Sequence, residues 1–223
     1  MTISDVYQRI ENVGIVPVVR APSSELAIRA VEALLEGGIS VLEITMTVPD
    51  AVSLVSMLRK RYGNRALVGA GTVVDAAQAR ACLEAGAEFV VSPGLNLEVL
   101  AAVRARGVAI LPGALTPTEV MAAAGAGADL IKIFPCSAVG GAKYLRALRG
   151  PFPALRFLPT GGVNLATAAE YIAAGAVALG LGGELVDIAL LEAGQDEEIS
   201  VRARKLVTAV AAARQSLAKP LRA

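Results

Sequence analysis

The chain has 223 residues, of which 55% are hydrophobic and 18% are charged, and its formal net charge at pH 7 is +1. This length and apolar content are typical of one large globular domain with an extensive core, and they exclude disordered and fibrous proteins. Because acidic and basic residues are interspersed, the charge favours neither nucleic acid nor an anionic membrane surface as a partner. We therefore expect a single domain over residues 1–223 that binds small molecules.

The apolar residues come in short segments. Even the apolar stretch 171–183 is interrupted by glycine and is shorter than the ~20 residues that a spanning helix needs. The N-terminus has no basic start followed by an apolar core, so a signal peptide is not indicated. We expect a cytoplasmic protein that does not associate with membranes.

Cysteine and histidine usage restricts the chemistry. The two cysteines, Cys82 and Cys136, have no spacing typical of a disulfide or zinc framework, and we expect both to be free thiols. Histidine is absent, which removes the commonest metal ligand and the usual general base. We therefore predict no metal site, and we expect carboxylates, lysine, tyrosine or water to transfer protons.

Strand and helix patterns alternate along the chain, beginning with a short helix predicted over Ser4–Asn12. Eight apolar runs of strand length follow: Gly14–Arg20, Val41–Met46, Leu67–Thr72, Phe89–Gly94, Val108–Gly113, Asp129–Pro135, Arg156–Gly162 and Ala176–Gly183. Stretches with helical periodicity lie between them, for example Glu25–Gly37, Pro49–Tyr62, Asp75–Ala85 and Asn96–Arg106. The tail, Asp196–Ala223, is helical in pattern until Pro220.

Four predicted helix-to-strand joints each have a glycine where the helix stops and the strand begins: residues 36–39, 85–88, 125–128 and 174–177. This similarity indicates a repeated strand–helix unit. Eight such units predict an α/β fold, a single (β/α)8 TIM barrel, with a short N-terminal helix covering its bottom and a C-terminal helix. An open doubly wound sheet is the alternative.

Lys132 lies inside the apolar run 129–135, where an ammonium group is normally excluded. Alternation places Lys132 on the face of Leu130 and Phe134, opposite two isoleucines that suit packing against helices. We expect Lys132 to point into the barrel near the carboxyl ends of the strands, where active sites of this architecture lie. Burial disfavours the charged amine, and a neutral amine attacks carbonyl carbon. The alternative is a lysine whose head reaches solvent.

Glu43 is a second charged residue that we expect inside the barrel. Alternation in the run 41–46 places it on one face with Val41 and Thr45. Two opposite charges in a barrel are costly unless they are paired or functional. A purely structural ion pair is the alternative, and it would leave the polar residues around the pair unexplained.

Further candidates lie at the ends of other strands. Thr72 ends the third run and Arg20 ends the first, and either side chain is suited to hold a carboxylate, although such positions often only cap a loop. We expect Pro93 and Phe134 to form apolar walls of the site.

Two glycine-rich segments, residues 160–164 and 180–184, each follow a strand and open a helix. Backbone N–H groups and helix N-termini bind phosphate, and the loops after the seventh and eighth strands are its usual place in these barrels. We predict a phosphate site there, and plain turns are the alternative.

Five short segments occur in an order typical of one enzyme family: Leu42–Thr45, Gly69–Val73, Val91–Gly94, Ile131–Pro135 and Pro159–Val163. They resemble the 2-keto-3-deoxy-6-phosphogluconate (KDPG) aldolases, also called Entner–Doudoroff aldolases. The resemblance spans roughly residues 10–215. It implies a class I aldolase, a carbon–carbon lyase, on a TIM barrel that is usually a homotrimer and often also acts as a 4-hydroxy-2-oxoglutarate aldolase.

The resemblance also implies roles for individual residues. By position, Lys132 matches the Schiff-base lysine of the family and Glu43 matches the carboxylate that shuttles protons. Thr72, Pro93 and Phe134 match residues around the pyruvate half, and Gly161, Gly162, Gly182 and Gly183 match the phosphate-binding loops. Thr160, which precedes the first of these loops, is also a predicted substrate-binding residue.

Two positions depart from the family pattern. Many members carry an arginine two residues after Thr45, where this chain has Thr47. Some branches instead carry an arginine at the end of the first strand, so we expect Arg20 to supply the positive charge for the substrate carboxylate, with Thr47 kept in the predicted site. Gly183 stands where members commonly have a serine that contacts phosphate, which favours a weaker preference for phosphorylated substrates.

The predicted reaction is the cleavage of KDPG to pyruvate and glyceraldehyde 3-phosphate through an imine on Lys132, with no metal or organic cofactor. The alternatives are a 4-hydroxy-2-oxoglutarate aldolase that yields pyruvate and glyoxylate, a 2-keto-3-deoxy-6-phosphogalactonate aldolase, and an oxaloacetate decarboxylase. Absence of histidine disfavours a metal-dependent aldolase. A non-catalytic phosphate-binding barrel is the alternative from another class.

Overall fold

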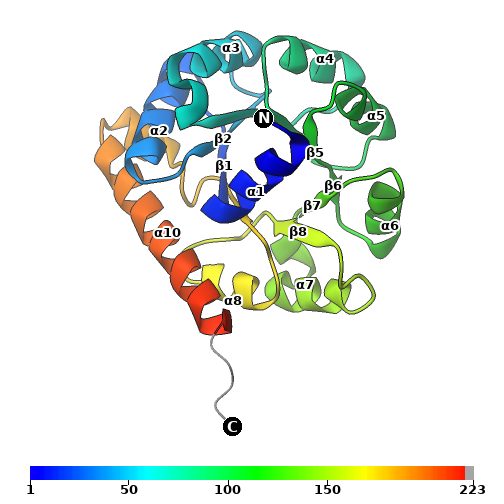
Figure 1. The fold of residues 1–223 in the computed structure, drawn as a ribbon. Coiled ribbons are helices and arrows are strands. Elements are labelled where there is room, and N and C mark those ends of the chain that lie inside the picture. The colour runs from blue at the N-terminus through cyan, green and yellow to red at the C-terminus, as the bar shows by residue number, and fades with distance from the viewer. Residues whose placement is uncertain (219–223) are drawn as a thin grey trace.

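The computed structural model describes residues 1–218, in which strands and helices alternate around a ring (Figure 1). The elements in chain order are α1 (Ile3–Val13), β1 (Ile15–Val19), α2 (Ser24–Glu36), β2 (Val41–Thr45), α3 (Ala51–Tyr62), β3 (Leu67–Gly71), α4 (Ala76–Glu84), β4 (Phe89–Val91), α5 (Leu97–Ala105), β5 (Ala109–Leu111), β6 (Gly113–Ala114), α6 (Pro117–Gly125), β7 (Leu130–Ile133), α7 (Gly141–Arg149), β8 (Arg156–Pro159), α8 (Ala168–Ala173), β9 (Leu179–Leu181), α9 (Ile188–Glu192) and α10 (Asp196–Ala218). Two 3-10 helices, η1 (Gly63–Arg65) and η2 (Cys136–Val139), follow α3 and β7.

The helix-to-strand joints repeat one geometry, as the sequence predicts. The four glycines Gly38, Gly86, Gly127 and Gly175 have φ of 87°, 91°, 85° and 94°. At each joint the glycine N–H and the next N–H donate to carbonyls in the last turn of the helix, as in the Schellman motif; Gly38 donates to Leu35 and Ile39 donates to Leu34. A left-handed residue at each joint therefore turns the chain from one helix into the next strand.

The strands form two parallel sheets. One has six strands in the order β5-β4-β3-β2-β1-β9, and the other has three in the order β6-β7-β8. The sheets meet at Pro112, which separates β5 from β6, and at a single parallel bridge between Thr160 and Gly180. The predicted closed (β/α)8 barrel is not confirmed, because the ladder is interrupted at both places. Proline has no N–H to donate, so the predicted strand 108–113 is split where Pro112 lies. The fold is a parallel α/β fold with a six-stranded half-barrel.

Side-chain alternation divides the core into an inner and an outer cluster. The inner cluster contains Leu130 and Val41, whereas Ile131 and Leu42 belong to the outer cluster between the strands and the helices. The predicted facing of β2 and β7 is therefore confirmed, with the face of Lys132 turned inward.

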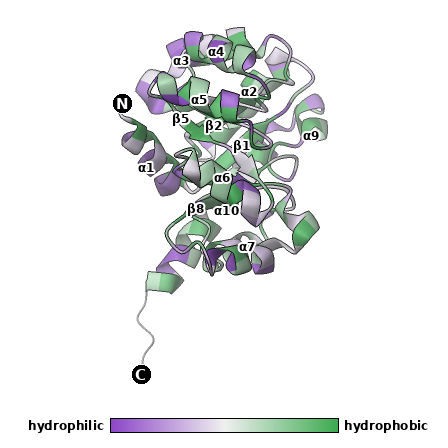
Figure 2. Cartoon of the chain, turned by 90° about the vertical axis from the view of Figure 1, so that its right-hand side faces the viewer, coloured by the Kyte–Doolittle hydropathy of each residue, from purple (hydrophilic) through white to green (hydrophobic). Residues whose placement is uncertain are grey.

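Helix α1 closes one end of the inner cluster, as predicted for the short N-terminal helix. Val6, Tyr7 and Ile10 of α1 pack into this cluster, and the Tyr7 hydroxyl donates to the Ile110 carbonyl at 2.8 Å. Figure 1 shows α1 across the centre of the ring, and Figure 2 shows α1 and α9 at opposite ends of the molecule. The end near α9 is thus left for a site.

Helix α10 lies against α2 and α8 and so fastens the end of the chain to its beginning (Figure 1). Arg214 of α10 donates to the carbonyls of Glu11 at 2.6 Å and Val177 at 2.7 Å. The predicted C-terminal helix is confirmed to Ala218, and the predicted stop at Pro220 lies outside the described residues. Among residues 1–218, no helix is both long enough and apolar enough to cross a membrane.

Candidate active site

A cavity of about 560 Å³ opens where the strands end, on the side away from α1. Nine residues of the predicted site line it: Arg20, Thr72, Pro93, Lys132, Phe134, Thr160, Gly161, Gly182 and Gly183. They come from β7 and from the loops after β1, β3, β4, β7, β8 and β9, so segments far apart in the sequence converge on one space. Ile188, the first residue of α9, lies on the same wall.

Lys132 lies on the wall of this cavity and is 5% exposed. Its backbone is fixed between β6 and β8, opposite Gly113 and Leu158. The Nζ atom lies 5.3 Å from the centroid of the Phe134 ring. The amine is therefore nearly dry, held by a rigid strand, and open to a ligand only from the cavity.

Glu43 lies behind Lys132 and not on the cavity wall. It is 1% exposed, and its Oε1 is 4.0 Å from Lys132 Nζ. That separation exceeds hydrogen-bond reach and suits a bridging water, and Oε1 has no hydrogen-bond partner in the described part of the chain. Gly71 makes room for the carboxylate, since a Cβ on Gly71 would lie 2.0 Å from Oε1.

The electrostatic surroundings of Glu43 prepare it to exchange a proton. Burial raises the pKa of its carboxyl above the ordinary value, while the charges of Lys132 and Arg20 lower it. Burial is the largest of these effects, because a dry site disfavours the ionised carboxylate. A carboxyl with a raised pKa beside a buried amine is the kind of pair found at acid–base sites.

Thr72 and Arg20 lie together at the cavity. Thr72 follows β3 with a φ of 59°, which is rare for a β-branched residue and stores backbone strain. Arg20 Nη2 makes a long contact of 3.5 Å to Thr72 Oγ1. The arginine is exposed at the cavity and so presents a positive charge to an entering ligand.

The two glycine-rich loops meet at another part of the cavity wall. Gly161, Gly182 and Gly183 line it, and a Cβ on either Gly182 or Gly183 would meet no atom within 4 Å. The backbone of these loops therefore faces open space. Thr160 is 5% exposed, and its Oγ1 has no hydrogen-bond partner among residues 1–218, which suits a hydroxyl that binds a ligand.

Two predicted substrate-binding residues are not on the cavity wall. Thr47 is exposed, and its hydroxyl lies 2.7 Å from the hydroxyl of Thr45, so the two side chains are hydrogen-bonded to each other. Gly162 lies next to the lining residue Gly161 and contacts Ser137. Arg20 thus lines the cavity, whereas Thr47 does not.

Four lining residues were missed by the sequence analysis: Val18, Val186, Asp187 and Ile188. Alternation in β1 could have found Val18, because it shares a face with Arg20. Val186 and Asp187 belong to the irregular segment after β9, where no periodicity applies, and Ile188 follows them as the first residue of α9. Asp187 begins α9 by accepting from the Ala189 N–H, and Arg202 of α10 lies 3.3 Å from its carboxylate.

The cysteines lie outside this chemistry. Cys82 and Cys136 are both buried and free, as predicted. Burial raises the pKa of each thiol to about 11, so neither is a ready nucleophile. Within the described residues, no three side chains of the histidine, cysteine and acidic types gather as metal ligands.

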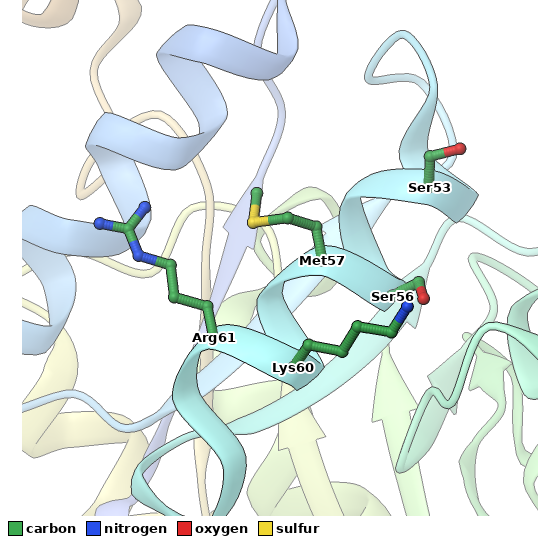
Figure 3. A pocket seen from close by; sticks show the side chains of 5 residues that line it. All are labelled: Ser53, Ser56, Met57, Lys60 and Arg61. Carbon is green, nitrogen blue, oxygen red and sulfur yellow. The ribbon is translucent and has the colours of Figure 1, made fainter.

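A second hollow lies on the outer surface along α3, lined by Ser53, Ser56, Met57, Lys60 and Arg61 (Figure 3). All five come from one helix, and Arg61 reaches away toward α2, where it pairs with Glu32. No buried polar group lies among them, so this hollow lacks the features of the cavity at Lys132.

The profile of the KDPG and KHG aldolase family matches residues 6–201. The chain belongs to this family. Two relatives extend over nearly the whole chain. A 2-dehydro-3-deoxy-phosphogluconate aldolase of Treponema pallidum is 35% identical, covering 92% of this chain and 97% of the relative, and a KHG/KDPG aldolase of Escherichia coli is 38% identical, covering 86% and 90%.

Solved structures of family members have the same fold. A KDPG aldolase from Legionella pneumophila, with pyruvate captured as a covalent carbinolamine, has a TM-score of 0.84 and is 31% identical, covering 92% of this chain and 98% of that one. A structure described as native KDPGal has a TM-score of 0.83 and is 32% identical, covering 90% and 96%.

Proposed function

We propose that this protein is a class I aldolase that cleaves KDPG to pyruvate and glyceraldehyde 3-phosphate, a step of the Entner–Doudoroff pathway. The observation that carries the proposal is the buried amine of Lys132 on the cavity wall, 4.0 Å from the buried carboxylate of Glu43. The names of the aldolase relatives and the carbinolamine in the Legionella enzyme support it.

Lys132 supplies the nucleophile of the reaction. Its Nζ attacks the keto carbon of the substrate, and the resulting carbinolamine loses water to give an iminium. Glu43 carries the protons of these steps through a water, which fits its distance of 4.0 Å from Nζ. The iminium is an electron sink, so bond cleavage needs no metal or organic cofactor.

Glu43 then removes the proton of the hydroxyl on the fourth carbon. The carbonyl of the leaving aldehyde forms as the bond between the third and fourth carbons breaks, and that electron pair forms an enamine on the pyruvate half. Protonation of the third carbon and hydrolysis of the imine release pyruvate and restore Lys132. Pro93 and Phe134, both on the cavity wall, exclude water around the pyruvate half.

Arg20 binds the substrate carboxylate in this proposal. Replacing it by alanine is expected to raise KM for the keto acid about tenfold to hundredfold, because a charge-assisted hydrogen bond is lost. Steady-state kinetics on Arg20→Ala checks this, with Arg80→Ala, an exposed arginine on the outer helix α4, as the matched control. An unchanged KM in Arg20→Ala would remove Arg20 from the carboxylate site.

The direct test is pyruvate release, followed with lactate dehydrogenase. We expect the highest kcat/KM with KDPG, and a rate that a metal chelator leaves unchanged. The galactonate epimer and 4-hydroxy-2-oxoglutarate are compared in the same assay, because Gly183 offers no side-chain donor to phosphate and so favours some turnover of the shorter, unphosphorylated substrate. Pyruvate from none of the three would reject the proposed activity.

Several broader features belong to the same proposal. The half-barrel and the three-stranded sheet together make a closed (β/α)8 TIM barrel. Two features support this: β5 and β6 are separated only by Pro112, and a parallel bridge joins Thr160 to Gly180. The chain is one domain over residues 1–223, assembles as a homotrimer, and acts in the cytoplasm on small 2-keto acids.

A further inference from the structure

Ser137 lies in the 3-10 helix η2, which follows β7 and meets the first glycine-rich loop. Its backbone N–H donates to the Gly161 carbonyl at 3.2 Å. A Cβ built on Gly162 would lie 2.3 Å from Ser137 Cβ and 2.4 Å from its Oγ, so the serine hydroxyl sits directly against the Cα of Gly162. Ser137 is exposed; it does not itself line the cavity, but its backbone hydrogen bond places it next to the lining residue Gly161.

The donors at this end of the cavity are mainly backbone N–H groups. Gly161, Gly182 and Gly183 contribute no side chains, and the hydroxyl of Thr160 lies beside them on the wall. A phosphate group has three acceptor oxygens and is held best by several donors of different direction. A hydroxyl at the edge of the first loop can donate a hydrogen bond to the phosphate from a direction that the glycine N–H groups do not cover.

The charge at this end is already balanced. Asp187 is the acidic residue on this wall, and its carboxylate is occupied by Arg202 at 3.3 Å and by the Ala189 N–H at 3.0 Å. Ser137 is a neutral donor, so it adds affinity for an anion without adding a full charge that would also attract unphosphorylated acids. A neutral donor therefore distinguishes substrates by whether they place a hydrogen-bond acceptor, such as a phosphate oxygen, next to it.

We propose that Ser137 determines specificity for a phosphorylated aldehyde half, its hydroxyl donating a hydrogen bond to the terminal phosphate of the substrate. The inference rests on the proposed aldolase function and deepens it, because it assigns preference for phosphate to the loop after β7. A competing interpretation is that Ser137 only fills space against Gly162. In that case its loss would affect all substrates alike.

The test compares Ser137→Ala with the wild type on KDPG and on 2-keto-3-deoxygluconate, which differs only in lacking the phosphate. We expect kcat/KM for KDPG to fall about five- to fiftyfold, while that for the unphosphorylated substrate stays within about twofold. Ser53→Ala is the matched control, since Ser53 is an exposed serine on the outer face of α3 (Figure 3). An equal change for both substrates, or none, would overturn the proposal.

A second variant and a binding measurement keep the inference separate from catalysis. Gly183→Ser in the Ser137→Ala background is expected to restore part of the preference, because the hydroxyl is moved to the facing loop. Calorimetric titration with glycerol 3-phosphate needs no turnover, and Ser137→Ala should weaken its binding about five- to fiftyfold. Unweakened binding rejects the role of Ser137, whereas weakened binding without aldol cleavage by the wild type rejects only the proposed function.

Discussion

Replacing Lys132 by alanine is expected to lower kcat/KM for aldol cleavage by at least about a thousandfold, because the nucleophile that forms the imine is removed. Intact-protein mass spectrometry after incubation with pyruvate and borohydride checks the cause directly. The wild type should gain one pyruvate-sized adduct, and Lys132→Ala should gain none.

The control for this experiment is Lys143→Ala, which removes an exposed lysine from the outer helix α7. It should retain both activity and adduct, since a solvated ammonium is a poor nucleophile at neutral pH. The absence of an adduct on a folded wild type would contradict the imine mechanism and favour a non-catalytic binding barrel. An adduct on Lys132→Ala would instead move the imine to another lysine.

The position of Lys132 could be predicted because one strand carries the information. Side chains alternate across a strand, and the two isoleucines in β7 assign one face to the helices, so the lysine between them must face inward. The glycine joints could be predicted equally well, since a glycine directly after a helix is by itself typical of a left-handed residue that ends the helix. Both predictions rest on local rules.

Distances and pairings between separate strands could not be predicted from the sequence, because they depend on how the strands meet in the fold. Alternation predicts which face of β2 carries Glu43, but it does not predict how far along the barrel axis Glu43 lies relative to Lys132. Because β2 and β7 belong to different sheets, the 4.0 Å separation between Glu43 and Lys132 depends on the whole fold. Proline at position 112 explains the break in the predicted strand, but the partner of each half also follows from the whole fold. The predicted strand 108–113 pairs with β4 through its first half and with β7 through its second, so it is divided between two sheets.

Site residues in irregular segments also could not be predicted from sequence patterns. Asp187 enters the cavity wall from a loop without periodicity, and its partner Arg202 is in α10. Ser137 became visible only through its contact with Gly162. Thr47, which was kept in the predicted site by its family position, is hydrogen-bonded to Thr45 and does not line the cavity. Tertiary contacts decided the cases of Asp187 and Ser137.

Replacing Glu43 by glutamine is expected to lower kcat about 10²- to 10⁴-fold, because the amide has nearly the same shape but cannot accept a proton from the substrate hydroxyl. Lys132 remains, so the pyruvate adduct should still form, more slowly, as dehydration of the carbinolamine loses its proton carrier. Glu84→Gln, a change at an exposed glutamate at the end of α4, is the matched control and should leave both rates unchanged.

The pH profile distinguishes a proton-transfer role of Glu43 from a structural one. The base must be ionised, and burial raises its pKa, so activity should fall as pH drops through a value above that of an ordinary glutamate. The wild-type profile of kcat/KM should therefore have an acid limb that begins at a higher pH than for an exposed carboxylate. Glu43→Gln should lose this limb while keeping its residual rate. If the limb persists unchanged in Glu43→Gln, another group carries the proton, and the separation of 4.0 Å from Lys132 serves packing alone.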